Sequence, residues 1–175
     1  INLEEIIDGT DNKKMKITIK QGSIVTEVVD AIVNPANCYG LMGGGVAKVL
    51  KVVGGEDIES EAISLAPTPV GEVCITKAGQ LPANFIIHAP VMHEPVEKTD
   101  STKIRDALVA ALEAAESEEY KKIAIPGLGT GVGDVSFEES AETMFEVINN
   151  FEFKNLQEII LKDINEEMVD SWRNK

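Results

Sequence analysis

Residues 31–47 read AIVNPANCYGLMGGGVA and combine a short apolar strand with a glycine-rich turn. Residues 123–134 repeat the arrangement as IAIPGLGTGVGD, again with an apolar strand before the glycines. Glycine has no side chain, so a ligand can approach the backbone closely, and the N–H groups at the start of a helix suit phosphate oxygens. Two such loops on one sheet predict a diphosphate that is held from both sides.

Other apolar segments extend this pattern along the chain. Polar and apolar residues alternate over 13–20, which predicts a strand with one wet face. Short runs that are apolar on both faces predict buried strands at 31–33, 73–76, 85–88, 123–125 and 159–161. Helical patterns lie between several of these runs. The alternation favours helices packed around a mostly parallel sheet, where ligands bind at the carboxyl ends of the strands.

Three helices are predicted in the second half of the chain. One covers residues 102–119, and a second begins at a capping box of Ser136 with Glu139. A third is predicted after a similar box of Asp163 with Glu166. On this last helix the apolar side chains are expected to stack at every fourth residue, and they are Ile164, Met168 and Trp172.

Length and composition narrow the classes of protein. The chain of 175 residues predicts one domain over 1–175, with residues 1–14 as a peripheral N-terminal segment. A formal charge of −14, from 16 basic and 30 acidic side chains, argues against direct nucleic-acid binding. The sequence has no apolar run near the roughly 18 residues of a membrane span. Cys38 and Cys74 are too few for a disulfide framework and lack zinc spacing, so we expect a cytoplasmic protein.

Two common phosphate-binding motifs do not fit. The segment after Gly45 lacks the Lys-Ser/Thr pair of a P-loop, and the second loop never forms the dinucleotide-binding pattern G-x-G-x-x-G. His88, His93 and Glu94 could be read as metal ligands, but His88 lies in an apolar strand and the helical His spacing of zinc enzymes is missing. We therefore expect no metal and no cofactor.

The first loop resembles the hallmark of the macrodomain family, which binds ADP-ribose, in its type that processes ADP-ribose 1″-phosphate. The resemblance is carried by residues 31–37 and 43–47 and supported by 21–25, 71–76, 86–90 and 126–133. It covers roughly residues 15–165. It implies a three-layer α/β/α sandwich with a mixed, mostly parallel central sheet, and as partner ADP-ribose or an ADP-ribosylated substrate.

The resemblance also implies the site. Residues 43–47 would line the diphosphate, residues 129–132 would close over it, and Asn37 would bind the distal ribose near its anomeric carbon. The alternatives are that Asn37 is a turn residue and that Asn34 fixes a loop through backbone bonds. The implied ligand-binding residues are Ser23, Ile24, Asn34, Asn37, Gly43, Gly44, Gly45, Val46, Ala47, Leu128, Gly129, Thr130, Gly131, Val132 and Gly133.

Three positions depart from the family. Ser23 stands where an aspartate commonly accepts a hydrogen bond from the adenine amine, and a neutral acceptor is weaker. Gly133 stands where an aromatic residue often packs on the distal ribose, so the sugar end would be looser or would leave room for a bulkier group. Ala47 stands where one hydrolase branch has an aspartate, so that branch's base is absent.

Catalysis by another branch remains open. That branch uses a lysine on the helix after the glycines and an aspartate in the second loop, which implies Lys51 and Asp134 as a catalytic pair beside Asn37. The alternative is a solvated helix lysine and a turn aspartate. We expect ADP-ribose binding with weak hydrolysis of ADP-ribosyl linkages or of ADP-ribose 1″-phosphate. The alternatives are a non-catalytic ADP-ribose reader and a pocket repurposed for another nucleotide.

Overall fold

The computed structural model describes residues 3–8 and 14–175, and within them seven strands form one sheet in the order β1-β2-β7-β6-β3-β5-β4. The strands are β1 (Leu3–Asp8), β2 (Lys14–Gln21), β3 (Ala31–Asn37), β4 (Cys74–Lys77), β5 (Phe85–Met92), β6 (Lys122–Ile125) and β7 (Glu158–Asp163). The helices are η1 (Ile24–Thr26, a 3-10 turn), α1 (Gly45–Gly54), α2 (Asp57–Leu65), α3 (Ser101–Ser117), α4 (Phe137–Asn150) and α5 (Glu166–Arg173).

The sheet is mixed and mostly parallel, as the sequence predicts. Strands β2, β7, β6, β3 and β5 are parallel neighbours, whereas β1 and β4 pair antiparallel at the two edges. The peripheral segment predicted at 1–14 includes β1 and the first residue of β2, and residues 1–2 and 9–13 lie outside the described residues. Lys13, where the first predicted strand begins, also lies outside them.

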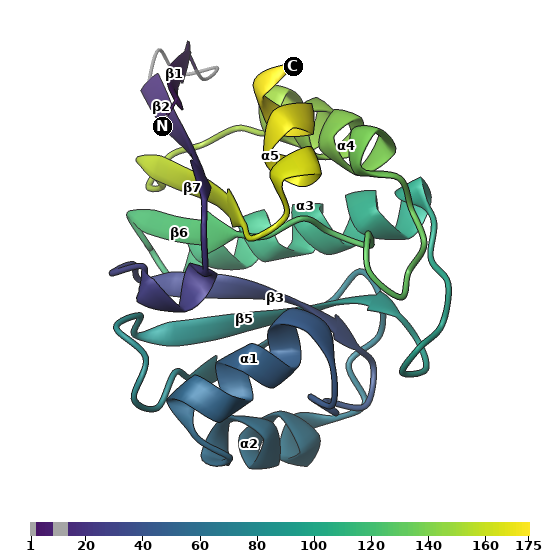
Figure 1. The fold of residues 1–175 in the computed structure, drawn as a ribbon. Coiled ribbons are helices and arrows are strands. Elements are labelled where there is room, and N and C mark those ends of the chain that lie inside the picture. The colour runs from purple at the N-terminus through teal and green to yellow at the C-terminus, as the bar shows by residue number, and fades with distance from the viewer. Residues whose placement is uncertain (1–2, 9–13) are drawn as a thin grey trace.

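Helices cover both faces of the sheet, so the molecule has three layers (Figure 1). On one face, α3, α4 and α5 bury Ile17, Val33 and Leu161 in the larger apolar core. On the other face, α1 and α2 bury Ile32 and Ile160 in a smaller core. Alternate residues of one strand enter the two cores because successive side chains of a strand point to opposite faces. The predicted α/β/α sandwich is confirmed.

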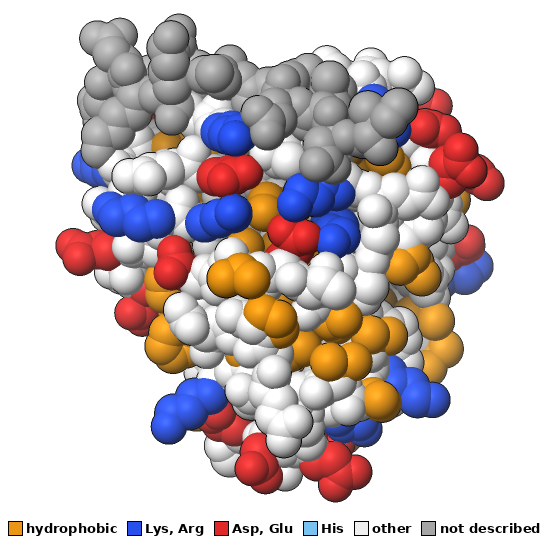
Figure 2. All heavy atoms as spheres, turned by 60° about the vertical axis from the view of Figure 1, so that its left-hand side comes forward, with side chains coloured by type: hydrophobic (Ala, Val, Ile, Leu, Met, Phe, Trp, Pro, Cys, Tyr) orange, Lys and Arg blue, Asp and Glu red, His pale blue; other side chains and the backbone are white. Residues whose placement is uncertain are grey.

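The second face is polar at its β2 and β7 side. Thr18 donates a hydrogen bond to Glu158 Oε2 at 2.7 Å, and Lys122 pairs with Glu158 at 3.6 Å. Figure 2, in which the left-hand side of Figure 1 comes forward, shows Lys and Arg side chains mixed with Asp and Glu in a band above hydrophobic side chains. The face that the alternation over 13–20 predicts as wet is polar but largely covered, because Thr18 is buried and Lys16 and Lys20 are half-buried.

Two predictions about single elements are wrong. The strand predicted at 73–76 begins at Cys74 and is an edge strand with only Thr76 fully buried. Helix α5 is capped by Asn165, whose side chain accepts from Glu167 N at 2.9 Å, and not by Asp163. Because α5 begins later than predicted, Ile164 lies outside it and is 74% exposed, while Met168 and Trp172 are buried.

Because α5 begins at Glu166, we expect truncation of Met168 and truncation of Ile164 to lower the free energy of unfolding by different amounts. Met168→Ala leaves a cavity between α5 and the sheet and should lower the free energy of unfolding by about 2–5 kcal/mol. Ile164→Ser should change it by no more than about 0.5 kcal/mol, because the side chain is exposed. Urea unfolding followed by circular dichroism measures both values. Equal losses would show that Ile164 packs as the sequence pattern predicts.

Candidate functional site

The residues predicted to bind a ligand meet at one edge of the sheet. Strands β2, β7, β6, β3 and β5 run parallel, so their carboxyl ends lie at the same edge. Ser23 and Ile24 follow β2, Asn37 ends β3, and the two glycine loops follow β3 and β6. We call this group the edge site and define it as Ser23, Ile24, Asn37, residues 43–47 and residues 130–132.

Asn37 closes the turn that leads from β3 to the glycines. Its Oδ1 accepts hydrogen bonds from Tyr39 N at 3.0 Å and Leu41 N at 3.3 Å, and its Nδ2 donates to Leu41 O at 2.8 Å. The side chain therefore does what the turn alternative predicts, because its amide is engaged by the loop backbone. A contact between Asn37 and a ribose stays a prediction.

Glu59 of α2 supports the next residue of the loop. Its Oε2 accepts from Met42 N at 2.6 Å, and its Oε1 pairs with Lys51 Nζ at 3.3 Å. Sequence reasoning missed Glu59 because nothing in an acidic helix marks the carboxylate that faces a loop. Lys51, predicted as catalytic, thus lies in the last turn of α1 with Glu59 as its partner.

The three glycines after Met42 have free space around their backbone. An added Cβ at Gly43, Gly44 or Gly45 would meet nothing within 4 Å. Helix α1 begins at Gly45, and its N-cap Gly44 has no side chain to accept a hydrogen bond. Among the described residues, no acceptor is found for the N–H groups of residues 43–47. These donors and the positive end of the helix dipole form a place for an anion.

The second loop contains two kinds of glycine. A Cβ at Gly127 would lie 2.6 Å from Met168 Sδ, and one at Gly129 would lie 2.7 Å from Ile104 Cδ1, so packing requires both glycines. Gly131 is exposed, and a Cβ there would meet nothing within 4 Å. Of the predicted residues 128–133, therefore, Thr130, Gly131 and Val132 reach the surface, and the Leu128 side chain is buried in the core.

The sequence predicts that Gly133 leaves room for a bulkier group at the sugar end of the ligand, but the structure shows no such room beside this glycine. A Cβ at this position would lie 2.6 Å from Gly129 O and 2.8 Å from Thr99 Cγ2. Thr99 N also donates to Gly133 O at 2.9 Å. The expectation of room for a bulkier group is wrong at this point, because neighbouring atoms of the same chain fill it.

Asp163 joins three segments of the edge. Its Oδ2 accepts from Gly127 N at 3.0 Å, its Oδ1 accepts from Asn165 N at 2.9 Å, and its carbonyl accepts from Gly22 N at 2.9 Å. Sequence reasoning placed Asp163 in a capping box. The signal that could have found this role is its position directly after β7, at the edge where the glycine loops begin.

Asn34 lies beneath the surface. It is fully buried, and its Nδ2 is 3.1 Å from His88 Nδ1, while His88 Nε2 is 2.9 Å from Thr76 Oγ1. Burial lowers the pKa of His88 to about 4, so the ring is neutral at pH 7 and can accept at Nδ1 and donate at Nε2. Asn34 Nδ2 thus contacts a side chain of the neighbouring strand β5 and not a loop backbone, and within the described residues its buried Oδ1 has no hydrogen-bond partner. The loop-fixing alternative for Asn34 is wrong, and its ligand contact stays a prediction.

Lys51 and Asp134, predicted as a catalytic pair, each pair with another residue. Asp134 adopts a positive φ of 63° and pairs with Lys98 at 3.5 Å on the exposed surface, whereas Lys51 pairs with Glu59. Near the first loop, Cys38 Sγ lies 3.6 Å from His93 Nδ1. Within the described part of the chain, no group of three or more His, Cys, Asp or Glu side chains is arranged to hold a metal ion.

Two shallow hollows lie away from the edge site. One, of about 320 Å³, is lined by residues of α3, of α4 and of the segment that follows α4, among them Arg105, Glu146 and Phe151. The other, of about 500 Å³, lies around the turn between β4 and β5. Neither hollow contains a residue of the glycine loops. No helix that the structure describes has the length and hydropathy for a membrane crossing.

Comparison with known proteins identifies the family. The family model described as Macro domain matches residues 33–144, which include both glycine loops. The chain belongs to the macrodomain family.

Relatives of this macrodomain agree in sequence and fold. An uncharacterized protein of Aquifex aeolicus is 52% identical over 158 residues, which are 90% of this chain and 96% of that protein. A mutant of the Oceanobacillus iheyensis macrodomain with ADPR has a TM-score of 0.87 at 23% identity, covering 100% of this chain and 96% of that chain. The Trypanosoma brucei macrodomain in complex with ADP-ribose has a TM-score of 0.82 at 24% identity, and the match covers 90% of this chain and 68% of that chain. The structures confirm the fold.

The buried His88 predicts a loss of stability in acid. Its pKa is about 4 in the folded protein and 6.5 as the ordinary value, so the unfolded chain takes up a proton first. The free energy of unfolding should therefore fall between pH 6.5 and pH 4, by up to about 3 kcal/mol from this residue. Urea unfolding across this range should show a shallower pH dependence for His88→Gln. Parallel profiles would contradict the neutral, buried state of His88.

Proposed function

We propose that this macrodomain binds ADP-ribose at the edge site. The carrying observation is the set of backbone N–H groups at Gly43, Gly44 and Gly45, for which the described residues provide no backbone acceptor and around which there is free space. Gly131, on the loop that follows the neighbouring strand β6, also has free space at its Cβ position. A diphosphate between these loops would accept hydrogen bonds from both. Packing requires the other glycines of the second loop, and the positive φ of 58° favours glycine at Gly45. Neither reason applies at Gly43, Gly44 and Gly131, so the fold does not explain these three glycines.

The charge of the chain supports binding through backbone groups. With a formal charge of −14, long-range attraction does not draw an anion to this protein. N–H groups at a helix start act over short distances and retain their strength in an acidic protein. Two structural neighbours, the Oceanobacillus iheyensis macrodomain mutant and the Trypanosoma brucei macrodomain, were solved with ADPR and with ADP-ribose, which supports the same ligand here.

The positions of the loops indicate where the two ends of the ligand, the distal ribose and the base, would lie. Asn37 begins the loop whose glycines take the diphosphate, so we place the distal ribose beside it. Ser23 and Ile24 lie at the end of β2, and we place the base there. Within this proposal residues 1–175 act as a single domain with the first 14 residues at its periphery. The non-catalytic reader is the simplest form of the function.

The substitution Gly44→Asp should weaken ADP-ribose binding without lowering the stability of the fold. Gly44 has extended dihedrals, φ −157° and ψ 170°, and open space at its Cβ, so an aspartate fits and can cap α1. The free energy of unfolding should stay equal or rise by up to about 1 kcal/mol. Affinity for ADP-ribose should fall at least about tenfold, because the carboxylate repels the diphosphate.

Calorimetric titration with ADP-ribose and AMP measures this effect. The wild-type chain should bind ADP-ribose more tightly than AMP, which lacks the second phosphate and the distal ribose. Asn149→Asp is the matched control, because it adds a carboxylate at the exposed end of α4. No binding of ADP-ribose by the wild-type chain, or unchanged binding by Gly44→Asp, would overturn the proposal.

Hydrolysis of ADP-ribosyl linkages or of ADP-ribose 1″-phosphate is the second candidate function. It is favoured by Asn37, at the start of the open glycine loop. Its Nδ2 has a second hydrogen besides the one donated to Leu41 O, and this hydrogen would orient a ribose hydroxyl or a water. Lys51 and Asp134 are the proposed catalytic pair. Each now has another partner, so the Lys51–Glu59 and Lys98–Asp134 pairs must open first. Exposed pairs such as Lys98–Asp134 are worth at most about 1 kcal/mol.

Turnover by the pair would be visible in single variants. Lys51→Met and Asp134→Asn should each slow the release of ADP-ribose from an ADP-ribosylated protein by about a hundredfold and leave ADP-ribose affinity unchanged. Phosphate release from ADP-ribose 1″-phosphate tests the second substrate. Lys48→Met, on the exposed side of α1, is the control. Equal rates in all variants would reject the pair, and no turnover by the wild-type chain would assign binding alone.

A further inference from the structure

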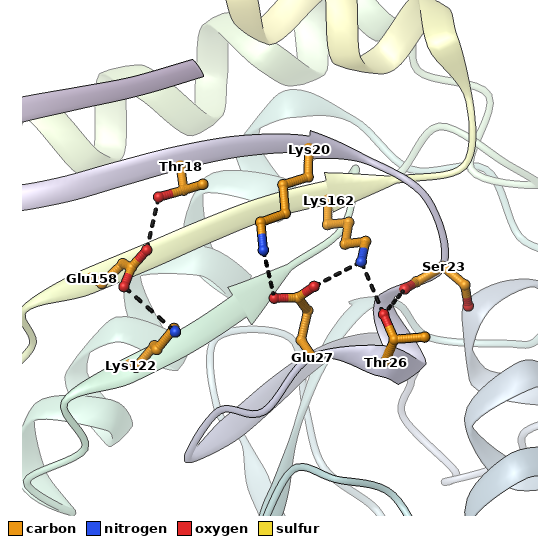
Figure 3. Close-up of polar contacts among 8 residues, drawn as sticks. All are labelled: Thr18, Lys20, Ser23, Thr26, Glu27, Lys122, Glu158 and Lys162. Atoms are coloured by element: carbon orange, nitrogen blue, oxygen red, sulfur yellow. Dashed lines mark hydrogen bonds and ion pairs between the residues drawn. The ribbon is translucent and has the colours of Figure 1, made fainter. Parts of the chain in front are cut away.

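A group of three charged side chains, two of them buried and the third partly buried, lies beneath the loop that follows β2. Lys20 and Lys162 are register partners in the parallel strands β2 and β7, so they project from the same face of the sheet. Figure 3 shows both ammonium groups directed toward Glu27. Glu27 Oε2 is 2.7 Å from Lys162 Nζ, and its Oε1 is 3.2 Å from Lys20 Nζ. We call these three residues the charged triad.

The charged triad carries an excess positive charge. Two ammonium groups face one carboxylate, and the side chains of Lys162 and Glu27 are only 10% and 9% exposed. Burial would raise the pKa of Glu27, but the hydrogen bonds and charges of Lys162 and Lys20 outweigh it and lower the pKa below its ordinary value. Glu27 is thus ionised at pH 7. Glu158 is already bonded to Thr18 and Lys122, nearer the other end of the strands.

Lys162 lies directly against the loop that holds Ser23. An added Cβ at Gly22 would lie 3.1 Å from Lys162 Cε, so the lysine stem passes beneath this glycine. Lys162 Nζ also donates to Thr26 Oγ1 at 3.0 Å, and Thr26 donates in turn to Ser23 O at 3.1 Å. An ammonium has three donors, and two of those of Lys162 are used by Thr26 and Glu27. The positive charge is therefore held beneath Gly22 and Thr26, which lie on either side of Ser23 and Ile24 in the loop.

We propose that the charged triad makes the base end of the edge site selective for a base with a carbonyl oxygen, such as hypoxanthine, over the amino base adenine. This inference rests on the proposed function, which places the base at Ser23 and Ile24. The ligand class is then a nucleoside diphosphate ribose whose base presents an oxygen to this loop.

The electrostatics favour this class for two reasons. A fixed positive charge in a poorly solvated place attracts the negative end of a carbonyl and repels the hydrogens of an exocyclic amine. Ser23 is neutral, and its hydroxyl can donate to a carbonyl oxygen, which a carboxylate at this position could not do. Both effects act in the same direction at the same end of the ligand.

Titration with ADP-ribose and inosine diphosphate ribose at pH 7.5 tests the inference. The wild-type chain should bind the inosine compound about threefold to tenfold more tightly, as expected for a hydrogen bond assisted by a nearby charge. Lys162→Met should remove this preference. Lys122→Met is the matched control, because it removes a lysine from the same face near the amino ends of the strands and should leave the preference unchanged.

Thermal melting confirms that each variant is folded. If Lys162→Met does not fold, Lys20→Met removes the same charge from a more exposed position, and Ser23→Asp should shift the preference toward ADP-ribose. A wild-type preference for ADP-ribose would overturn the inference and leave the proposed function intact. An unchanged preference in folded Lys162→Met or Lys20→Met would also overturn it. If neither compound binds to the wild-type chain, the proposed function fails and the inference fails with it.

Discussion

Buried backbone N–H groups at the carboxyl edge of the sheet need acceptors, and this requirement organises the loops around the glycines. Asn37, Glu59 and Asp163 supply acceptors to the loops on either side of the glycines, at Leu41, Met42 and Gly127. Unsatisfied buried donors cost about 1–3 kcal/mol each, so these bonds hold the loops in one arrangement. The donors that remain open belong to residues 43–47, where no side chain of the described residues reaches them.

Some of the acidic side chains have a structural role in the loops of the edge site. Carboxylates of Glu59 and Asp163 bind the backbone around the edge site, so part of the negative charge acts as internal structure. Anion binding is left to peptide dipoles at the start of α1, which act locally. The charged triad is the exception, because there lysines outnumber the carboxylate and give one end of the site a different character.

Sequence reasoning worked best where a pattern acts through neighbours in the chain. Ser136 caps α4 as predicted, since its side chain accepts from Glu139 N at 3.1 Å within one turn. It failed where two local signals compete, as at Asp163, which looks like a helix cap but accepts from Gly127, 36 residues away. It also failed at Gly133, because a glycine that is required by packing and a glycine that is open to a ligand look alike in a sequence. Only the contacts with Gly129 and Thr99 separate them.

The sequence by itself determined the layers of this protein and the edge at which its loops meet. Alternation of apolar strands with amphipathic helices specifies a covered, mostly parallel sheet, and the direction of parallel strands brings both glycine loops to one side. Only the tertiary structure decided which polar side chains support that edge and which charges surround it. Nothing in the sequence marks Lys20, Glu27 and Lys162 as a group, and Lys162 is far from the other two in the chain. The pairing of β2 with β7 brings the three side chains together. Side-chain partners across strands depend on register and burial, and neither is written in local sequence pattern.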